Sequence, residues 1–359
     1  MQSDSVAYRL SAIICHLTAV FPIMIIPFFI PHAGCPHQCV FCNQRNITGQ
    51  IAQADPPSVP NRIEEYLNTG TGRRPVHVAF YGGSFTALPA ATQQDYLDAV
   101  RPFIVSGQVS GIRLSTRPDC ITGEILTRLK DSHVDIVELG VQSMDDHVLA
   151  LSGRGHTAED SVKAVRLLKE YDLAVGLQLM PGLPGDTPDI FLNTVEDVIA
   201  LKPDFVRLYP ALVIRDTPLA ELYKTGRYIP LHLDDAVSLC RSALLKFEQE
   251  DIEVIRIGLQ PTEELERPGT IMAGPYHPAF RQLVESSLLL ERMRALLKGR
   301  SEKDDTALIQ VNPRDLSAAI GQHRSNVDTL KREFGLRNIR IAADEGDLKR
   351  RTPVLIPSC

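Results

Sequence analysis

The sequence has no excess of positive charge. Its 359 residues carry 38 lysines and arginines against 44 aspartates and glutamates, a formal net charge of −6. Proteins that bind nucleic acid over a broad surface are usually basic, so any RNA contact must come from a local patch. The 7 cysteines do not form an even, spread set. A disulfide framework is therefore excluded, and this cysteine usage predicts a reducing, cytoplasmic location.

An uninterrupted membrane segment is also missing. Residues 10–30 are strongly apolar and long enough to cross a bilayer. However, Pro22 and Pro27 interrupt this stretch, and His16 lies within it. The chain also lacks the basic start and small-residue cleavage site of a signal peptide. We therefore expect no association with a membrane.

The apolar stretch is better divided in two. We expect residues 24–31 to form a short buried strand that leads into the first cysteine motif, and residues 1–23 to be an appendage. A compact enzyme that starts with a strand would begin naturally at Met24. We therefore predict Met24 as the physiological start.

A second pair of closely spaced metal ligands is absent as well. The sequence instead has one tight group of thiols, Cys35, Cys39 and Cys42, with CxxxCxxC spacing. Thiolates select zinc, copper(I) or iron–sulfur clusters. A closed zinc site would need a fourth ligand such as His32 or His37. A 4Fe–4S cluster on three cysteines would leave one iron with an open coordination position.

This spacing, with Phe41 just before the third cysteine, resembles the signature of the radical S-adenosylmethionine (SAM) superfamily. The resemblance implies that Cys35, Cys39 and Cys42 are the metal ligands of a 4Fe–4S cluster, and that Phe41 belongs to the cofactor site. The open iron would chelate the amino and carboxylate groups of SAM. One electron, delivered by an electron donor protein, would cleave SAM to methionine and a 5′-deoxyadenosyl radical.

Short apolar runs alternate with amphipathic patterns from residue 24 to about residue 259. Strands are expected over 24–30, 76–81, 111–116, 134–140, 173–180, 204–209 and near 252–258. Repeated βα units produce a parallel sheet with helices outside it. Ligands then bind at the carboxyl ends of the strands. We therefore predict an α/β fold, a partial (βα)6-type parallel barrel followed by a small C-terminal α/β tail.

The predicted organisation has five parts. The appendage is followed by the barrel core, a helical extension, a polar linker and the tail. Their expected ranges are 1–23, 24–259, 260–298, 299–305 and 306–359.

Six further motifs lie along the core. They are F-Y-G-G-S-F-T, S-T-R-P-D, E-L-G-V-Q-S, R-G-H-T, G-L-P-G-D-T and Y-P-A-L-V-I-R-D-T-P-L. In this order they resemble the radical SAM domain of the catalytic subunit of Elongator and of its shorter bacterial relatives, over residues 25–231 and more loosely to 297.

The resemblance implies a set of SAM contacts. Gly82, Gly83 and Ser84 would bind the amino group of SAM. Gln142 and Arg154 would contact its ribose and carboxylate, and the turn from Gly182 to Gly185 would lie against its adenine.

The sequence also departs from the Elongator pattern. The gap between its first two cysteines is shorter, and Ser115 stands where the Elongator subunit usually has a glutamate. Only about 60 residues follow the core, too few to fold the acetyltransferase domain of that subunit. We therefore expect no acetyl-transfer chemistry from this chain.

The tail contains V-N-P-R-D-L-S-A-A-I-G-Q-H-R-S-N-V, which resembles the helix–GxxG–helix core of KH domains. KH domains clamp single-stranded RNA at that turn. Here Arg324 replaces the second glycine. The tail is locally basic, through His323, Arg324, Lys331, Arg332, Arg337 and Arg340. It is either an RNA handle or a structural cap with a solvated basic face.

These observations favour a radical SAM enzyme that modifies RNA, most simply tRNA. One alternative is radical chemistry on a small molecule, as in the related oxygen-independent coproporphyrinogen oxidases. Another is a non-catalytic RNA-binding protein with a structural cluster. The last alternative would not need Gly82, Gly83, Gln142, Arg154 or Gly182.

Overall fold

The computed structural model describes residues 23–30, 34–43, 55–70, 74–299, 305–344, 346 and 348–356. The predicted appendage 1–23 lies outside the described residues, apart from Ile23. The predicted linker 299–305 is described only at its two ends. The start at Met24 and the division into five parts therefore remain predictions.

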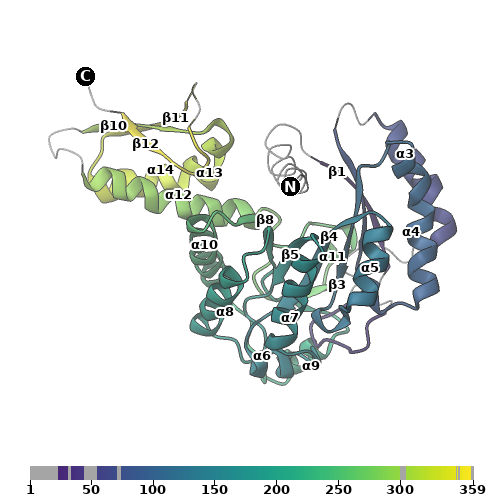
Figure 1. Ribbon diagram of the computed structural model, residues 1–359. Helices are drawn as coiled ribbons and strands as arrows, with labels where there is room; N and C mark the ends of the chain where they lie inside the picture. The colour runs from purple at the N-terminus through teal and green to yellow at the C-terminus, as the bar shows by residue number, and fades with distance from the viewer. Residues whose placement is uncertain are drawn as a thin grey trace.

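A curled parallel sheet forms the centre of the molecule (Figure 1). Within the described residues it has seven strands whose order in the sheet follows their order in the chain. They are β1 (Met24–Phe29), β2 (Val76–Tyr81), β3 (Gly111–Thr116), β4 (Val134–Gln142), β5 (Ala174–Leu179), β6 (Phe205–Leu208) and β8 (Glu253–Ile257). The predicted parallel half-barrel is confirmed, with one strand more than six.

Helices between the strands cover the outer face of the sheet (Figure 1). They are α3 (Val59–Asn68), α4 (Ala90–Val105), α5 (Gly123–Asp131), α7 (Ala158–Glu170), α8 (Pro188–Ala200) and α10 (Leu233–Gln249). The short helix α6 (Asp146–Leu151) packs elsewhere, because its Val148 lies in the apolar cluster that contains Cys39 and Phe41. Helix α7 begins with a capping box: Thr157 accepts from the Asp160 N–H, and Asp160 accepts from the Thr157 N–H. Thr187 caps α8, with Pro188 in its first turn.

The two faces of the sheet differ in chemistry. Alternate residues, such as Ile112 and Leu114 on β3, join the main apolar core under the helices. Arg113 lies between them and therefore points to the opposite, concave face. Glu138, between the core residues Val137 and Leu139, does the same on β4. The concave face is thus polar although it is buried.

Two short strands were not predicted. β7 (Val213–Ile214) and β9 (Ile271–Ala273) pair antiparallel beside the main sheet. Helix α9 (Pro218–Lys224) follows β7, and α11 (Glu263–Glu266) precedes β9. The range 260–298 therefore contains a strand as well as the expected helices.

The tail is a small layered unit at one end of the molecule (Figure 1). Its described sheet has the order β11–β10–β12, with β10 (Thr306–Val311) parallel to β11 (Asn338–Ala343) and antiparallel to β12 (Val354–Ile356). Helices α13 (Leu316–Ile320) and α14 (Ser325–Phe334) connect β10 to β11. The predicted order of strand, helix, turn, helix and strand is confirmed, whereas β12 was not predicted.

One helix joins the tail to the core. Phe280, Val284 and Leu288 in the first half of α12 (Phe280–Lys298) pack into the main core. Leu289, Met293 and Leu297 in its second half pack into the separate apolar core of the tail. α12 therefore contributes to both cores.

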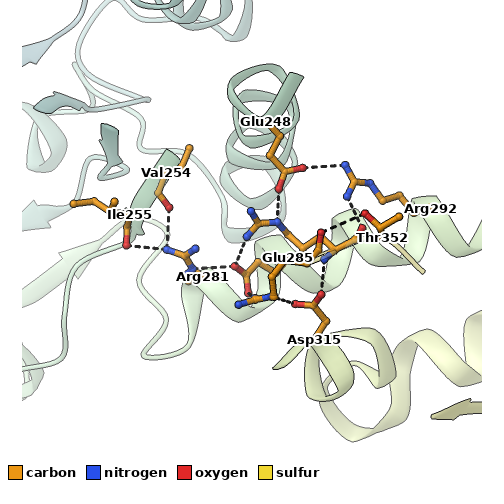
Figure 2. A network of polar contacts seen from close by, with 10 residues as sticks. Glu248, Val254, Ile255, Arg281, Glu285, Arg292, Asp315 and Thr352 are labelled. Carbon is orange, nitrogen blue, oxygen red and sulfur yellow. Dashed lines mark hydrogen bonds and ion pairs between the residues drawn. The ribbon is translucent and has the colours of Figure 1, made fainter. Parts of the chain in front are cut away.

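Figure 2 shows the polar network that surrounds this junction. Glu285 on α12 pairs with Arg281 at 2.9 Å and with Arg351 at 3.0 Å. Arg281 also donates to the carbonyls of Val254 and Ile255 on β8, at 3.1 and 2.9 Å. The side chains of α12 thus connect the edge of the main sheet to the end of the chain.

The same network ties the segment before β12 to two other elements. Asp315, which is 1% exposed, accepts from the Arg350 side chain and the Arg351 N–H. Glu248 on α10 pairs with Arg292 at 2.9 Å and also with Arg351 (Figure 2). Arg351 therefore bridges the tail, α12 and α10.

None of the helices in the described part of the chain combines the length and hydropathy needed to cross a membrane.

Candidate functional site

The three-cysteine loop lies at the carboxyl end of β1, where the sequence places it. Backbone hydrogen bonds hold Val40, in the middle of this loop, on both sides. Its N–H donates to the Ser152 carbonyl at 3.0 Å, and its carbonyl accepts from the Leu219 N–H at 2.8 Å. The loop is thereby fixed between the end of α6 and the start of α9.

Glycines allow the neighbouring loops to approach the cysteine loop closely. A Cβ on Gly153 would lie 3.1 Å from the Gln38 carbonyl oxygen, and one on Gly155 would lie 2.4 Å from the His37 ring. Both glycines also have positive φ, +65° and +73°. The segment G-R-G-H-T, residues 153–157, therefore packs directly on the cysteine loop, and its two glycines are required by that packing.

Polar side chains contact the sulfurs of Cys35 and Cys39. The Cys35 Sγ lies 3.4 Å from the Ser84 hydroxyl. Arg154 Nη1 donates to the Cys39 Sγ at 3.1 Å. Ser84 and Arg154, both predicted to bind SAM, are therefore placed on sulfur atoms in this structure.

Further hydrogen bonds hold Arg154 at the carboxyl edge of the sheet. Its Nη2 donates to the Gly140 carbonyl on β4, and its own carbonyl accepts from Arg117. Arg117 forms a two-pronged pair with Asp119 at 2.9 Å for each bond. Burial, together with the charges of Arg154 and Arg117, lowers the pKa of His156 to about 4. His156 is therefore neutral near pH 7.

The third predicted cluster ligand, Cys42, and the preceding residue, Phe41, lie in apolar surroundings. Phe41 packs in a buried cluster that also contains Cys39, Met180 and Leu183, with Cys42 against it. In the described residues, no three His, Cys, Asp or Glu side chains converge on a common point for a metal ion. The donor set nevertheless fits an iron–sulfur group, because three soft sulfurs share one loop and a buried cation contacts one of them.

Two further cysteines, Cys120 and Cys240, fall within the described residues. Burial raises the pKa of Cys240, which sits in the main core, and also that of Cys120 after β3. Cys15 and Cys359 lie outside the described residues.

Gln142 ends β4 in an unusual conformation. Its φ is +69°, and the pairing of β4 with β5 shifts register between Gly140 and Gln142. Its side chain accepts from Gln178 at 3.2 Å, and its carbonyl accepts from the Met180 N–H at 2.9 Å. A positive φ is uncommon for a non-glycine residue, and this one lies at the carboxyl edge of the sheet.

The turn after β5 is closed by one of its own side chains and by one from a distant segment. Asp186 accepts from the Gly182 N–H at 2.8 Å, and Tyr228 donates to the Gly182 carbonyl at 2.5 Å. Burial raises the pKa of Asp186 to about 6. Gly182 and Gly185 both have positive φ, and a Cβ on them would meet Leu231 and Leu151 at 2.8 and 2.7 Å. The two glycines are thus required by the shape of the turn.

The turn after β2 also contains a glycine with positive φ. Gly82 has a φ of +102°, and the half-buried Gly83 leads to Ser84, which is 1% exposed. These residues therefore bring backbone to the same edge of the sheet as Gln142.

A charged cluster on the concave face went unrecognised in the sequence. Glu138 pairs with Arg113 at 3.1 Å and with Arg207 at 2.6 Å, and it accepts from the Tyr81 hydroxyl at 3.1 Å. Arg207 also donates to the Tyr209 hydroxyl at 3.1 Å, which adds Tyr209 to this cluster. The sequence signal for this cluster was a charged residue, such as Glu138, between two apolar core residues of a buried strand.

The register of the sheet explains one departure from the Elongator pattern. Ser115 on β3 pairs with Glu138 on β4. A carboxylate is therefore present beside the position where the Elongator pattern has one, on the neighbouring strand.

In the tail, the G-Q-H-R turn has two consecutive residues in the left-handed region. φ is +50° for His323 and +65° for Arg324, and both side chains are exposed. Arg324 thus adopts the backbone conformation that a glycine would adopt without strain. The basic residues Arg332, Arg337 and Arg340 are also exposed, although Arg337 pairs with Asp305 at 3.1 Å.

Two family models match the chain. The model of the radical SAM superfamily matches residues 29–198, and that of the radical SAM C-terminal domain matches residues 203–289. The two matches run from the end of β1 to the middle of α12.

Curated proteins of similar sequence include the tRNA uridine(34) acetyltransferase of Methanocaldococcus jannaschii, 28% identical over 245 residues. This alignment covers 57% of the chain and 45% of that protein. Elongator complex protein 3 of Homo sapiens is 33% identical over 201 residues, which cover 50% of the chain and 36% of that protein. The chain therefore spans about half the length of these relatives or less.

A solved structure agrees with the fold. The archaeal Methanocaldococcus infernus Elp3 with an N-terminal deletion superposes with a TM-score of 0.59 at 23% identity. The superposition covers 75% of this chain and 63% of the other.

Proposed function

This chain belongs to the radical SAM superfamily of enzymes, and on that premise we propose that Cys35, Cys39 and Cys42 hold a 4Fe–4S cluster that binds SAM. When bound, this cluster supplies the electron that cleaves SAM to methionine and a 5′-deoxyadenosyl radical. The observation that carries the proposal is the buried contact of Arg154 with the Cys39 sulfur.

We assign the remaining site residues to SAM. Gly82 and Gly83 offer backbone to its amino group, and Gln142 offers a side chain held at the carboxyl edge of β4. Arg154 retains a donor for the carboxylate, because its buried Nε has no partner among the described residues. The turn from Gly182 to Gly185 offers backbone to the adenine.

We further propose that the enzyme modifies RNA, most simply tRNA, and draws its electrons from a donor protein. The name of the Methanocaldococcus jannaschii relative supports a tRNA substrate, and the region matched by the radical SAM superfamily model contains the cysteine loop. The exposed basic residues of the tail support an RNA handle at the turn around Arg324. Phosphate contacts by such residues position RNA without reading its sequence.

The test begins with anaerobic reconstitution of the full chain. One cubane cluster requires about four iron per chain. Replacing Cys35, Cys39 or Cys42 with Ala should abolish iron uptake and 5′-deoxyadenosine formation, whereas Cys240→Ala and Cys120→Ala should preserve both. Uptake of iron without formation of 5′-deoxyadenosine would favour a structural cluster.

The substrate needs a separate measurement. Binding of unmodified tRNA should weaken steeply with salt, because phosphate contacts release counterions. An enzyme that forms 5′-deoxyadenosine but binds no tRNA at low salt would contradict an RNA substrate and leave the radical SAM assignment intact.

A further inference from the structure

Arg154 is a buried cation whose charge is not balanced by a carboxylate. Only 6% of the surface of Arg154 is exposed. Among the described residues, no Asp or Glu oxygen lies within ion-pair distance of it, unlike Arg113, Arg117 and Arg207. Its partners are the Cys39 sulfur at 3.1 Å and the neutral Gly140 carbonyl. A buried charge without a counter-charge is strongly unfavourable.

The neighbouring arginine cannot relieve this imbalance. Arg117 contributes a second positive charge, but Asp119 neutralises it through two bonds of 2.9 Å. The Arg117 Nη2 that bonds Asp119 also donates to the Arg154 carbonyl. The Arg117–Asp119 pair therefore positions Arg154 without adding net charge near it.

The Cys39 sulfur can supply the missing negative charge. A cysteine that binds iron does so as a thiolate, so the Cys39 side chain becomes anionic when the cluster is in place. Cys35, in contrast, has the neutral hydroxyl of Ser84 at 3.4 Å. One sulfur of the loop thus receives a charged donor and another receives an uncharged one.

We propose that Arg154 is the charge partner of the cluster and raises its reduction potential. The inference rests on the proposed function, since it requires the cluster. Reduction adds one electron to the cluster and changes no bond of the protein. A fixed guanidinium beside a ligating sulfur stabilises the reduced form more than the oxidised form, because the reduced form is more negative. Hydrogen bonds to the sulfurs and nearby charge are general determinants of such potentials.

The test is a redox titration of the reconstituted full chain without SAM. Dithionite serves as the one-electron reductant, and EPR reports the reduced fraction. In Arg154→Met we expect the ratio of reduced to oxidised cluster, at a fixed solution potential, to fall at least tenfold. For a one-electron couple this corresponds to about 59 mV. Arg154→Lys, which keeps the charge, should lie between this variant and the wild type.

Two controls separate the charge from other effects. Ser84→Ala removes the uncharged donor and should shift the potential less than Arg154→Met. Arg166→Met removes an exposed arginine on α7 and should leave the potential unchanged. Equal potentials in wild type and Arg154→Met, with normal iron content, would overturn the proposal.

If Arg154→Met loses its iron, two other variants still test the proposal. Arg154→Gln keeps a donor without the charge and is then compared with Arg154→Lys. A higher potential in Arg154→Lys, or iron uptake by Arg154→Lys alone, supports the charge partner. Equal potentials in the two, or loss of iron from all three folded variants, overturns it. If the wild type itself binds no iron, the proposed function fails instead.

Discussion

Arg351 and Glu285 form an ion pair of 3.0 Å between the end of the chain and α12. The side chain of Glu285 is only 11% exposed and that of Arg351 only 17%. Glu285 keeps Arg281 and Arg350 as further partners, and Glu248 keeps Arg292. The pair thus belongs to a network in which no carboxylate depends on Arg351 alone.

Arg351→Met should therefore destabilise the protein by an intermediate amount. Fully buried pairs cost more than exposed ones when one partner is removed, and the remaining arginines limit the loss to about 1–3 kcal/mol. Urea denaturation of the full chain measures the change. Arg340→Met, at an exposed position on β11, is the control. Equal stability of the two variants would mean that the network does not hold the tail.

Gly34→Ala should disturb the cysteine loop. Gly34 has a φ of +73°, and a Cβ there would lie 2.4 Å from the Ser84 carbonyl oxygen. Gly70 also has positive φ, +83°, but a Cβ on it would meet no atom within 4 Å. Gly70→Ala should cost only the conformational penalty of about 1–2 kcal/mol. Gly34→Ala should cost more and should also reduce iron uptake during reconstitution. Equal stability and iron content in the two variants would contradict this packing.

Asp135→Asn should stabilise the protein more at pH 8 than at pH 4.5. Burial raises the pKa of Asp135 from 3.8 to about 6, so ionisation of this carboxyl group destabilises the folded state. The wild type therefore loses stability as the pH rises from about 4 to about 6, and the Asn variant avoids this loss. We expect a gain of about 1–3 kcal/mol at pH 8 that shrinks toward pH 4.5. Asp131→Asn, at an exposed position on α5, should show no such pH dependence.

Variants of Arg324 test the turn of the tail. Arg324→Gly removes the strain of a left-handed side-chain residue, with a gain of up to about 1 kcal/mol. If the turn clamps RNA, this variant should keep or improve tRNA affinity, and Arg324→Glu should weaken it. Filter binding at two salt concentrations measures both. Unchanged, salt-insensitive affinity in all three proteins would indicate a structural cap.

The local sequence pattern predicted the repeating strands and helices of the barrel well. Continuous apolar runs such as β1, and helix starts such as Thr157, carry their own signals in neighbouring residues. The strands that escaped prediction, β7, β9 and β12, have only two or three residues each. Such short strands form because a partner is nearby, and the sequence around them does not indicate that partner.

The contacts of the site depended on the fold. Arg154 was recognisable between two glycines, but its partner Cys39 lies 115 positions earlier. The cluster around Glu138 requires the register of β3 on β4, which shifts after Ile112. A one-residue irregularity of this kind moves side chains between faces and cannot be read from composition.

The division of α12 between two cores has a consequence for producing the protein. During synthesis Leu289, Met293 and Leu297 emerge before the tail elements that pack against α12. Until α13, α14 and β12 have been added, this apolar stripe faces water, and exposed surface of this kind promotes aggregation. A chain truncated at residue 298 would keep the stripe exposed permanently. Expression of the barrel without the tail should therefore give insoluble protein, unless these three leucine and methionine side chains are also replaced by polar ones.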